Sequence, residues 1–286
     1  MKKAWPLLIS LLAGLAAPSY SGAKGTLFII GGGDRPESMM RQFVDLAGRF
    51  GSGKIIVFPM ASSEPAETGA RLVAEFKGLG AKEAEYHILT REQALAGESI
   101  RLLDDAGAVF FSGGDQARQM AVLRGTPIQR RLLELYSEGC VMAGTSAGAA
   151  VMSEVMITGD EQRKAEEGYE FSTLEAGNIV TVEGLGFLRT VIIDQHFVTR
   201  KRHNRLISLV AEHPRLLGIG IDEETAIVVG PDDRFEVVGN RNVVVYDAAR
   251  ASVTITPAKA ISFSGAVMHV LGAGDRFDLK KRKVMR

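Results

Sequence analysis

The stretch Val141-Met142-Ala143-Gly144-Thr145-Ser146-Ala147-Gly148-Ala149 joins a short apolar strand to a run of small residues that is typical of a helix start. Between them stands the pattern Gly-x-Ser-x-Gly, which is typical of a nucleophile elbow, a strand-to-helix turn too crowded for side chains beside the serine. Such a turn raises the hydroxyl of Ser146 above the end of the sheet. It also directs the backbone N–H of Ala147 at the oxygen of an acyl group under attack. We therefore take Ser146 as the candidate nucleophile and Ala147 as a candidate oxyanion donor.

The first half of the chain alternates short apolar strands with amphipathic helices. Strands are expected at residues 26–30, 54–59, 85–89, 108–111 and 141–143, and helices at 39–50, 70–79, 116–123 and 128–138. This alternation predicts an α/β fold with a doubly wound, mostly parallel sheet. Beyond Leu217, short strands separated by turns predict a β-rich C-terminal extension of the same sheet. No linker or repeat divides the chain, so we expect one domain.

The N-terminal residues have the order of a secretory signal. Two lysines are followed by an apolar run at 4–17 and by small residues that favour cleavage after Ala23. The apolar run is too short to span a bilayer, and no later segment is apolar enough to do so. The sequence thus predicts a signal peptide at 1–23, one mature domain at 24–286, and a secreted or periplasmic protein without a membrane partner after cleavage.

Charge and cysteine content exclude several classes of function. The chain has 34 basic and 34 acidic residues, and loss of Lys2 and Lys3 with the signal would leave 34 − 2 = 32 basic residues. A nearly neutral chain gives no reason to expect nucleic acid as a partner. The single cysteine, Cys140, excludes an internal disulfide and a cysteine metal cluster, and we expect it in the core. No metal-ligand spacing is present, so neither a metal nor an organic cofactor is expected.

An activated serine needs a base, and His196 is the best placed of the five histidines. It ends the apolar strand 191–196, which should bring it to the same sheet edge as Ser146. For His87, His213 and His269 a structural role is favoured.

The next strand, 217–221, runs into Asp222-Glu223-Glu224 and supplies the acid. Strand alternation places Glu223 on the face shared with Ile219 and Ile221, so Glu223 is the preferred orienting acid and Glu224 the alternative. The order serine, histidine, acid differs from the order serine, acid, histidine of α/β-hydrolase esterases. The esterase reading of the elbow is therefore disfavoured.

Other strand-end loops should meet at the same edge of the sheet. Gly31-Gly32-Gly33-Asp34 lacks both G-x-G-x-x-G and a Walker lysine, so it predicts a tight turn rather than a phosphate loop. Loops at 60–64 and 112–116 follow two further strands. The segment 157–177 is polar and irregular, which predicts a loop or lid.

Three arginines, Arg200, Arg202 and Arg205, gather at the start of a helix, where the macrodipole already favours negative charge. A carboxylate-bearing ligand would explain this cluster, and a solvated basic face is the alternative. Asp194 beside the cluster could take a ligand's ammonium or guanidinium group.

At this point the sequence resembles the cyanophycinase family of serine exopeptidases, relatives of dipeptidase E with the class I glutamine amidotransferase-like, flavodoxin-like fold. Four segments carry the resemblance in family order, namely Gly113-Gly114-Asp115-Gln116, Gly144-Thr145-Ser146-Ala147-Gly148-Ala149, Asp194-Gln195-His196-Phe197 with the three arginines, and Gly218-Ile219-Gly220-Ile221-Asp222-Glu223.

The resemblance implies a triad of Ser146, His196 and Glu223. It also implies a substrate site, with the residues Gln116, Asp194, Gln195, Arg200, Arg202 and Arg205. Family members release β-Asp-Arg dipeptides from cyanophycin, a poly-aspartate that carries arginine on each side-chain carboxyl. The backbone N–H groups of Ala147 and Gly114 would hold the oxyanion of an acyl-enzyme mechanism. A related aspartyl or isoaspartyl dipeptidase and a non-catalytic exported binding protein of the same fold are the alternatives, and a homodimer is left open.

Overall fold

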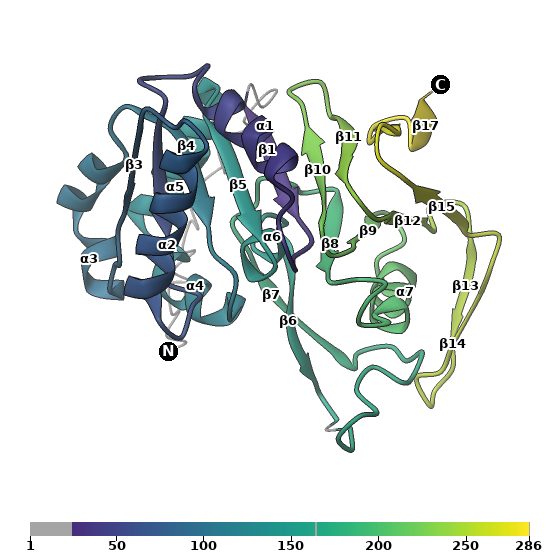
Figure 1. The fold of residues 1–286 in the computed structure, drawn as a ribbon. Helices are drawn as coiled ribbons and strands as arrows, with labels where there is room; N and C mark the ends of the chain where they lie inside the picture. Colours follow the sequence, from purple (N-terminus) through teal and green to yellow (C-terminus); the bar gives the residue numbers. More distant parts are fainter. Residues whose placement is uncertain (1–24, 164, 286) are drawn as a thin grey trace, which may run out of the picture.

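The computed structural model describes residues 25–163 and 165–285, so the predicted signal at 1–23 lies outside the described residues. The central element is a nine-stranded sheet (Figure 1) in the order β17-β16-β11-β10-β1-β5-β4-β2-β3. Its parallel half consists of β1 (Thr26–Ile30), β2 (Lys54–Phe58), β3 (Glu83–Tyr86), β4 (Ala106–Phe111) and β5 (Val141–Thr145). Its antiparallel half consists of β10 (Thr225–Val229), β11 (Arg234–Gly239), β16 (Arg276–Asp278) and β17 (Lys283–Met285).

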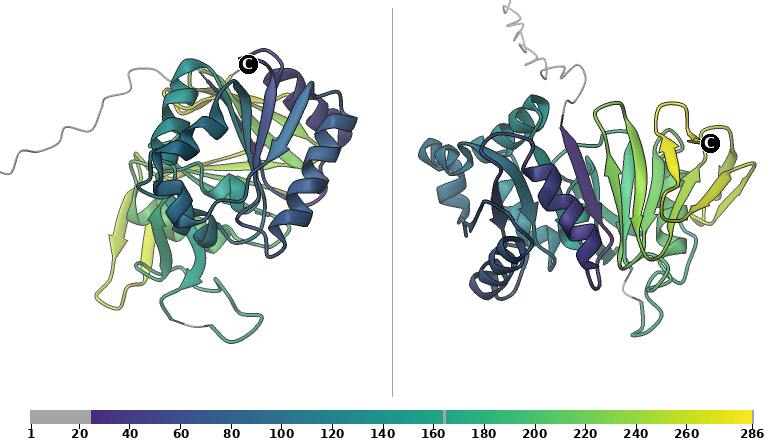
Figure 2. Two further views of the ribbon diagram at one scale, coloured as in Figure 1. Left: turned by 90° about the vertical axis from the view of Figure 1, so that its left-hand side faces the viewer. Right: turned by 45° about the horizontal axis from the view of Figure 1, so that its top comes forward.

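Helices cover both faces of the parallel strands, as the left view of Figure 2 shows. One face carries α1 (Glu37–Ala47) and α2 (Pro65–Gly78). The other carries α3 (Arg91–Leu95), the 3₁₀ helix η1 (Gly97–Leu103), α4 (Gln116–Leu123), α5 (Pro127–Glu138) and α6 (Ala147–Ala150). Strand alternation sends Phe28 to the first face and Leu27 to the second. The predicted doubly wound α/β fold is therefore confirmed.

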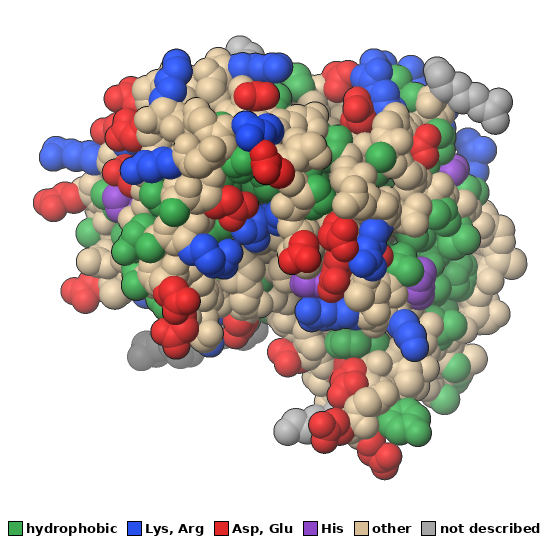
Figure 3. All heavy atoms as spheres, viewed as in Figure 1, with side chains coloured by type: hydrophobic (Ala, Val, Ile, Leu, Met, Phe, Trp, Pro, Cys, Tyr) green, Lys and Arg blue, Asp and Glu red, His purple; other side chains and the backbone are tan. Residues whose placement is uncertain are grey.

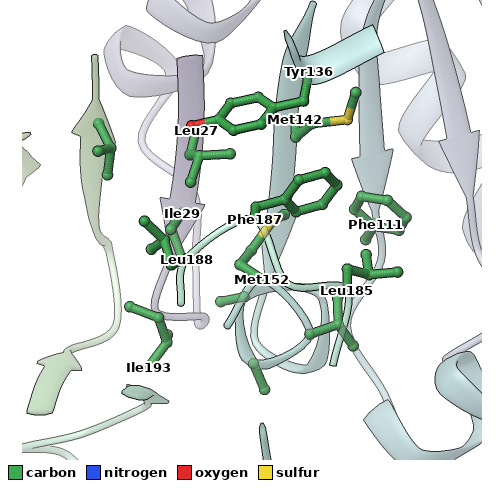
Figure 4. Packing of buried hydrophobic residues seen from close by; sticks show 14 of the residues in the cluster. Leu27, Ile29, Phe111, Tyr136, Met142, Met152, Leu185, Phe187, Leu188 and Ile193 are labelled. Atoms are coloured by element: carbon green, nitrogen blue, oxygen red, sulfur yellow. The ribbon is translucent and has the colours of Figure 1, made fainter. Parts of the chain in front are cut away.

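The second face holds the larger core cluster, part of which Figure 4 shows. There the rings of Tyr136 and Phe187 meet edge to face, with centroids 5.3 Å apart. Cys140 belongs to this cluster and is fully buried. Burial raises the pKa of its thiol to about 12, which keeps it protonated and unreactive. The core role expected for Cys140 is confirmed.

A second, four-stranded sheet in the order β15-β12-β9-β8 corrects part of the prediction. It contains β8 (Val191–Gln195), β9 (Leu217–Ile221), β12 (Val243–Asp247) and β15 (Val267–Leu271), and α7 (His203–Glu212) packs on it. We expected β8 and the late strands in the same sheet as β5; β10, β11, β16 and β17 do extend that sheet, whereas β8, β9, β12 and β15 form the separate one. Both edges of β9 are occupied by β8 and β12, while β10 takes the free edge of β1. The chain thus changes sheet between β9 and β10, at residues 222–224.

Two antiparallel hairpins extend from the body of the molecule (Figure 1). One pairs β6 (Val155–Glu161) with β7 (Ile179–Glu183), and the other pairs β13 (Ser252–Ile255) with β14 (Ile261–Ser264). The segment expected to be irregular at 157–177 therefore begins as a strand. Among the described residues, no helix has the length and apolar character needed to cross a membrane.

Candidate active site

The turn from β5 into α6 has the backbone strain expected of a nucleophile elbow. Ser146 has a φ of 54°, which is uncommon for a residue with a side chain. A Cβ on Gly144 would lie 2.3 Å from the carbonyl oxygen of Gly148, and one on Gly148 would lie 2.1 Å from that of Phe111. Both glycines of the motif are thus required by close backbone contacts. The N–H of Ser146 donates to the carbonyl of Ile30 at 3.0 Å, which ties the turn to β1.

A chain of hydrogen bonds connects this serine with a histidine and a carboxylate. His196 Nε2 lies 2.8 Å from Ser146 Oγ, and His196 Nδ1 lies 2.6 Å from Glu223 Oε1. A carboxylate only accepts, so Nδ1 carries the proton and Nε2 is free to accept from the hydroxyl. The side chain of His196 is 8% exposed. Although β5 and β8 belong to different sheets, the carboxyl ends of the two strands meet here.

The two candidate acids separate clearly. Glu223 faces the imidazole, whereas Glu224 has a φ of 55° and accepts hydrogen bonds from Arg241 at 2.9 Å and Asn240 at 3.1 Å. β9 ends at Ile221, but the alternation of side chains between the two faces continues for two more residues, to Glu223. The chain then turns toward β10. Of the two acids that the sequence left open, Glu223 is the one in contact with His196.

The Gly31-Gly32-Gly33 loop is a tight turn against this histidine and acid. The carbonyl of Gly31 accepts from the N–H of His196 at 2.8 Å, and that of Gly32 accepts from Glu224 at 2.9 Å. Gly32 has a φ of 118°, and a Cβ on it would lie 2.3 Å from the imidazole. The loop therefore positions the histidine, and its lack of side chains leaves room for the ring.

Replacing Gly32 with alanine should lower kcat roughly 100-fold, because the methyl group can be accommodated only by displacing the imidazole. The measurement is steady-state hydrolysis beside a thermal unfolding curve. Gly78→Ala is the matched control, since a Cβ there meets nothing within 4 Å. It should retain full activity and gain up to about 1 kcal/mol of stability. Wild-type kcat in the Gly32 variant would contradict this positioning role.

The electrostatic surroundings hold the pKa of His196 below its ordinary value of 6.5. Burial is the main cause, the hydrogen bond that His196 donates to Glu223 opposes it, and the positive charges of Arg200 and Arg202 lower the pKa further. The lowered pKa favours the neutral imidazole, which is the form that can accept a proton.

The pH dependence of kcat/KM should reflect this shift. Because the neutral imidazole is the active form, the acid limb should have its midpoint below pH 6.5. Arg200→Ala removes a charge that disfavours the imidazolium, so it should move the midpoint upward, and Arg130→Ala on α5 should leave it in place. A midpoint above 6.5 in the wild type would show that the stabilisation by Glu223 outweighs burial.

Backbone N–H groups are available for an oxyanion near Ser146. Within residues 25–163 and 165–285, the N–H groups of Ala147, Gly113 and Gly114 donate to no other protein group. A Cβ on Gly113 would lie 3.4 Å from Cβ of Ser146, while one on Gly114 would face the carbonyl of Ala61. Gly113 is thus the glycine that lies beside Ser146, and the N–H of Gly114 is the next one along the chain.

The residues predicted to bind substrate fall into two groups, those that are buried and bonded within the protein and those that lie beside His196. Asp194 and Arg205 are both buried and bind each other through two hydrogen bonds, so they do not offer charges to a ligand. Arg205 also stacks on Phe171, with its guanidinium carbon 4.8 Å from the ring centroid. Gln116 is buried and donates to the carbonyl of Ile157 at 2.9 Å, which anchors the β6–β7 hairpin.

Arg202 and Arg200 remain beside the histidine. Arg202 is half-buried and donates to Gln195, at 2.9 Å to the carbonyl and at 2.7 Å to Oε1. Burial, together with the charge of Arg205, lowers the pKa of Arg202 to about 10, so Arg202 stays charged at neutral pH. Arg200 is exposed.

A cavity of about 290 Å³ opens next to Ser146, His196 and Gly113. Its lining also includes residues that the sequence analysis did not single out, namely Arg35, Ser62, Thr68 and Arg71. Ser62 stands in the predicted strand-end loop 60–64, but no motif marked the others. Acidic, basic and histidine side chains adjoin one another near the middle of the face drawn in Figure 3. Among the described residues, no group of three or more His, Cys, Asp or Glu side chains could hold a metal ion.

A histidine that connects a strand-end serine to a carboxylate is the arrangement of serine hydrolases. The chain matches peptidase family S51 over residues 27–237 and belongs to that family; it is a serine-type peptidase.

Cyanophycinases from Trichormus variabilis and Geminocystis herdmanii are 36% and 34% identical to it. The matches cover 92% of this chain and 88% and 96% of those proteins. A peptidase from an acI-B1 actinobacterium shares the fold, with a TM-score of 0.67 and 24% identity over 90% of this chain and 98% of the other. The resemblance to the cyanophycinase family is confirmed.

Proposed function

We propose that this peptidase hydrolyses cyanophycin to β-Asp-Arg dipeptides through an acyl-enzyme. The observation that carries the proposal is the hydrogen-bonded series Ser146, His196, Glu223 in a chain whose relatives are named cyanophycinases. Ser146 is the nucleophile, His196 the base and Glu223 the group that orients the imidazole.

The reaction proceeds in two halves. His196 Nε2 takes the hydroxyl proton as Ser146 Oγ attacks a backbone carbonyl of the poly-aspartate chain, since a β-Asp-Arg product keeps its side-chain linkage. The oxyanion accepts hydrogen bonds from Ala147 and from Gly113 or Gly114. The imidazolium then protonates the leaving nitrogen, the C–N bond breaks and the dipeptide departs. Water, deprotonated by His196, hydrolyses the ester and restores the serine.

Positive charges near the cavity support a substrate that carries carboxylates. Arg200 and Arg202 lie close enough to His196 to lower its pKa, so they can also bind a carboxylate near the scissile bond. Cyanophycin has a free carboxylate on every arginine and at the end of its backbone.

The test is incubation of the purified protein with cyanophycin, with mass spectrometric identification of the products. We expect β-Asp-Arg to accumulate from the start of the reaction. Cleavage of short α- or β-aspartyl peptides without attack on the polymer would replace this proposal by that of an aspartyl dipeptidase. No cleavage of either would favour a binding protein.

We also propose that the chain is exported after cleavage behind Ala23, which the signal-like order of residues 1–23 supports. Expression of the full chain in a bacterial host, followed by N-terminal mass mapping of the periplasmic fraction, tests this. A mature N-terminus at Lys24 is expected, and an intact, cell-retained Met1 would contradict it.

A further inference from the structure

One face of α2 contributes to the lining of the Ser146 cavity. Thr68, Arg71, Leu72 and Glu75 recur at helical spacing on that face, and the first three line the cavity. Their side chains differ in whether they are already occupied. Thr68 Oγ1 shares a hydrogen bond of 2.8 Å with Ser62 Oγ.

The acid and the second arginine of this wall bind each other. Arg35 Nε donates to Glu75 Oε1 at 3.2 Å, and its terminal nitrogen donates to Oε2 at 2.5 Å. The side chain of Arg35 is 15% exposed and fixed by this bidentate pair. Its charge is thereby compensated within the protein.

Arg71 stands between these pairs without a partner of its own. In the part of the chain that the structure describes, its guanidinium makes neither an ion pair nor a hydrogen bond. It is exposed at the cavity rim and carries a planar fork that suits a carboxylate. The cavity therefore has an uncompensated positive charge on α2, in addition to the charges of Arg200 and Arg202 that act on His196.

We infer that Arg71 binds the α-carboxylate of the substrate's arginine branch and so selects for that branch; this inference rests on the proposed function. The backbone carboxylate of the departing unit is attached to the carbon next to the scissile nitrogen, so it must stay close to Ser146. The carboxylate of the branch lies several bonds farther out. It therefore reaches the cavity wall, where Arg71 is the free cation among the described lining residues.

The test uses short β-Asp-Arg oligomers whose arginine carboxylates are either free or amidated. With free carboxylates, Arg71→Ala should lower kcat/KM about 10-fold, mainly through KM. The kcat/KM of Arg71→Lys should lie between those of wild type and Arg71→Ala, because lysine keeps the charge but loses the planar fork. With amidated oligomers, wild type and Arg71→Ala should agree within about 2-fold. Arg130→Ala, on the opposite face of the sheet, is the matched control and should behave as wild type on both.

A calorimetric titration with the β-Asp-Arg dipeptide and its amide separates this inference from the proposed function, because binding needs no turnover. If the wild type cleaves no cyanophycin, the proposed function fails. The inference still predicts that the dipeptide binds wild type about 10-fold more tightly than Arg71→Ala, while the amide does not distinguish them. Equal losses with free and amidated ligands, or no loss with either, would overturn the role of Arg71.

Discussion

Ser146→Ala should abolish hydrolysis, with a loss in kcat of about 10⁴- to 10⁶-fold. The variant lacks the only oxygen within 2.8 Å of His196 Nε2 that could attack a carbonyl, as far as the described residues show. Binding and oxyanion contacts remain, so KM should change little. The measurement is kcat on cyanophycin, with the product mass as readout.

The fold of this variant should be intact. The substitution removes one hydroxyl, and its hydrogen bond to His196 is worth about 1 kcal/mol. The strained φ of 54° is borne equally by alanine. Ser264→Ala, an exposed serine of β14, serves as the control for serine loss and should keep full activity. If Ser146→Ala retained more than a few per cent of wild-type kcat, another group would have to be the nucleophile.

Much of the fold could be predicted because its signals are local. α4 has the expected bounds Gln116–Leu123, and α1, α2 and α5 begin or end within a few residues of the expected positions, whereas α3 and η1 were not predicted. Division into two sheets could not be predicted in this way. The apolar pattern of β9 reveals that both of its faces are buried, but not which neighbours take its edges.

For the site, the sequence reveals residue types and order but not pairing. Glu223 could be singled out because strand alternation, a local rule, continues for two residues past β9. Asp194 and Arg205 looked equally ready for a ligand, yet they neutralise each other across eleven positions of chain. Such compensation depends on where α7 packs on β8. Arg71 was missed for the converse reason, since an arginine on a helix carries no signal until a cavity forms beside it.

The largest effect among the acids should come from Glu223→Gln, with a loss in kcat of about 10³- to 10⁴-fold and little change in KM. A glutamine amide can donate to His196 Nδ1, which would leave the ring proton on Nε2, pointing at Ser146. The base would then hold the wrong tautomer. The imidazolium would also lose the negative charge that stabilises it. Glu223→Asp should retain part of the activity, because it keeps the carboxylate charge, although the shorter side chain places that carboxylate farther from His196.

Glu224→Gln is the matched control, one residue away and of the same chemistry. Glu224 contacts Arg241 and Asn240 rather than His196, and these hydrogen bonds lower the pKa of its carboxyl. The amide keeps an oxygen for only one of these two donors, but neither donor contacts the imidazole, so kcat should change less than about 3-fold. A reversed result, with the larger loss in Glu224→Gln, would mean that the acid acts through the turn into β10 and not through its contact with the imidazole. Both variants make the same chemical change, in which an amide nitrogen replaces one carboxylate oxygen. The ratio of their effects therefore separates the hydrogen bond between Glu223 and His196 from the general cost of losing a carboxylate in this turn.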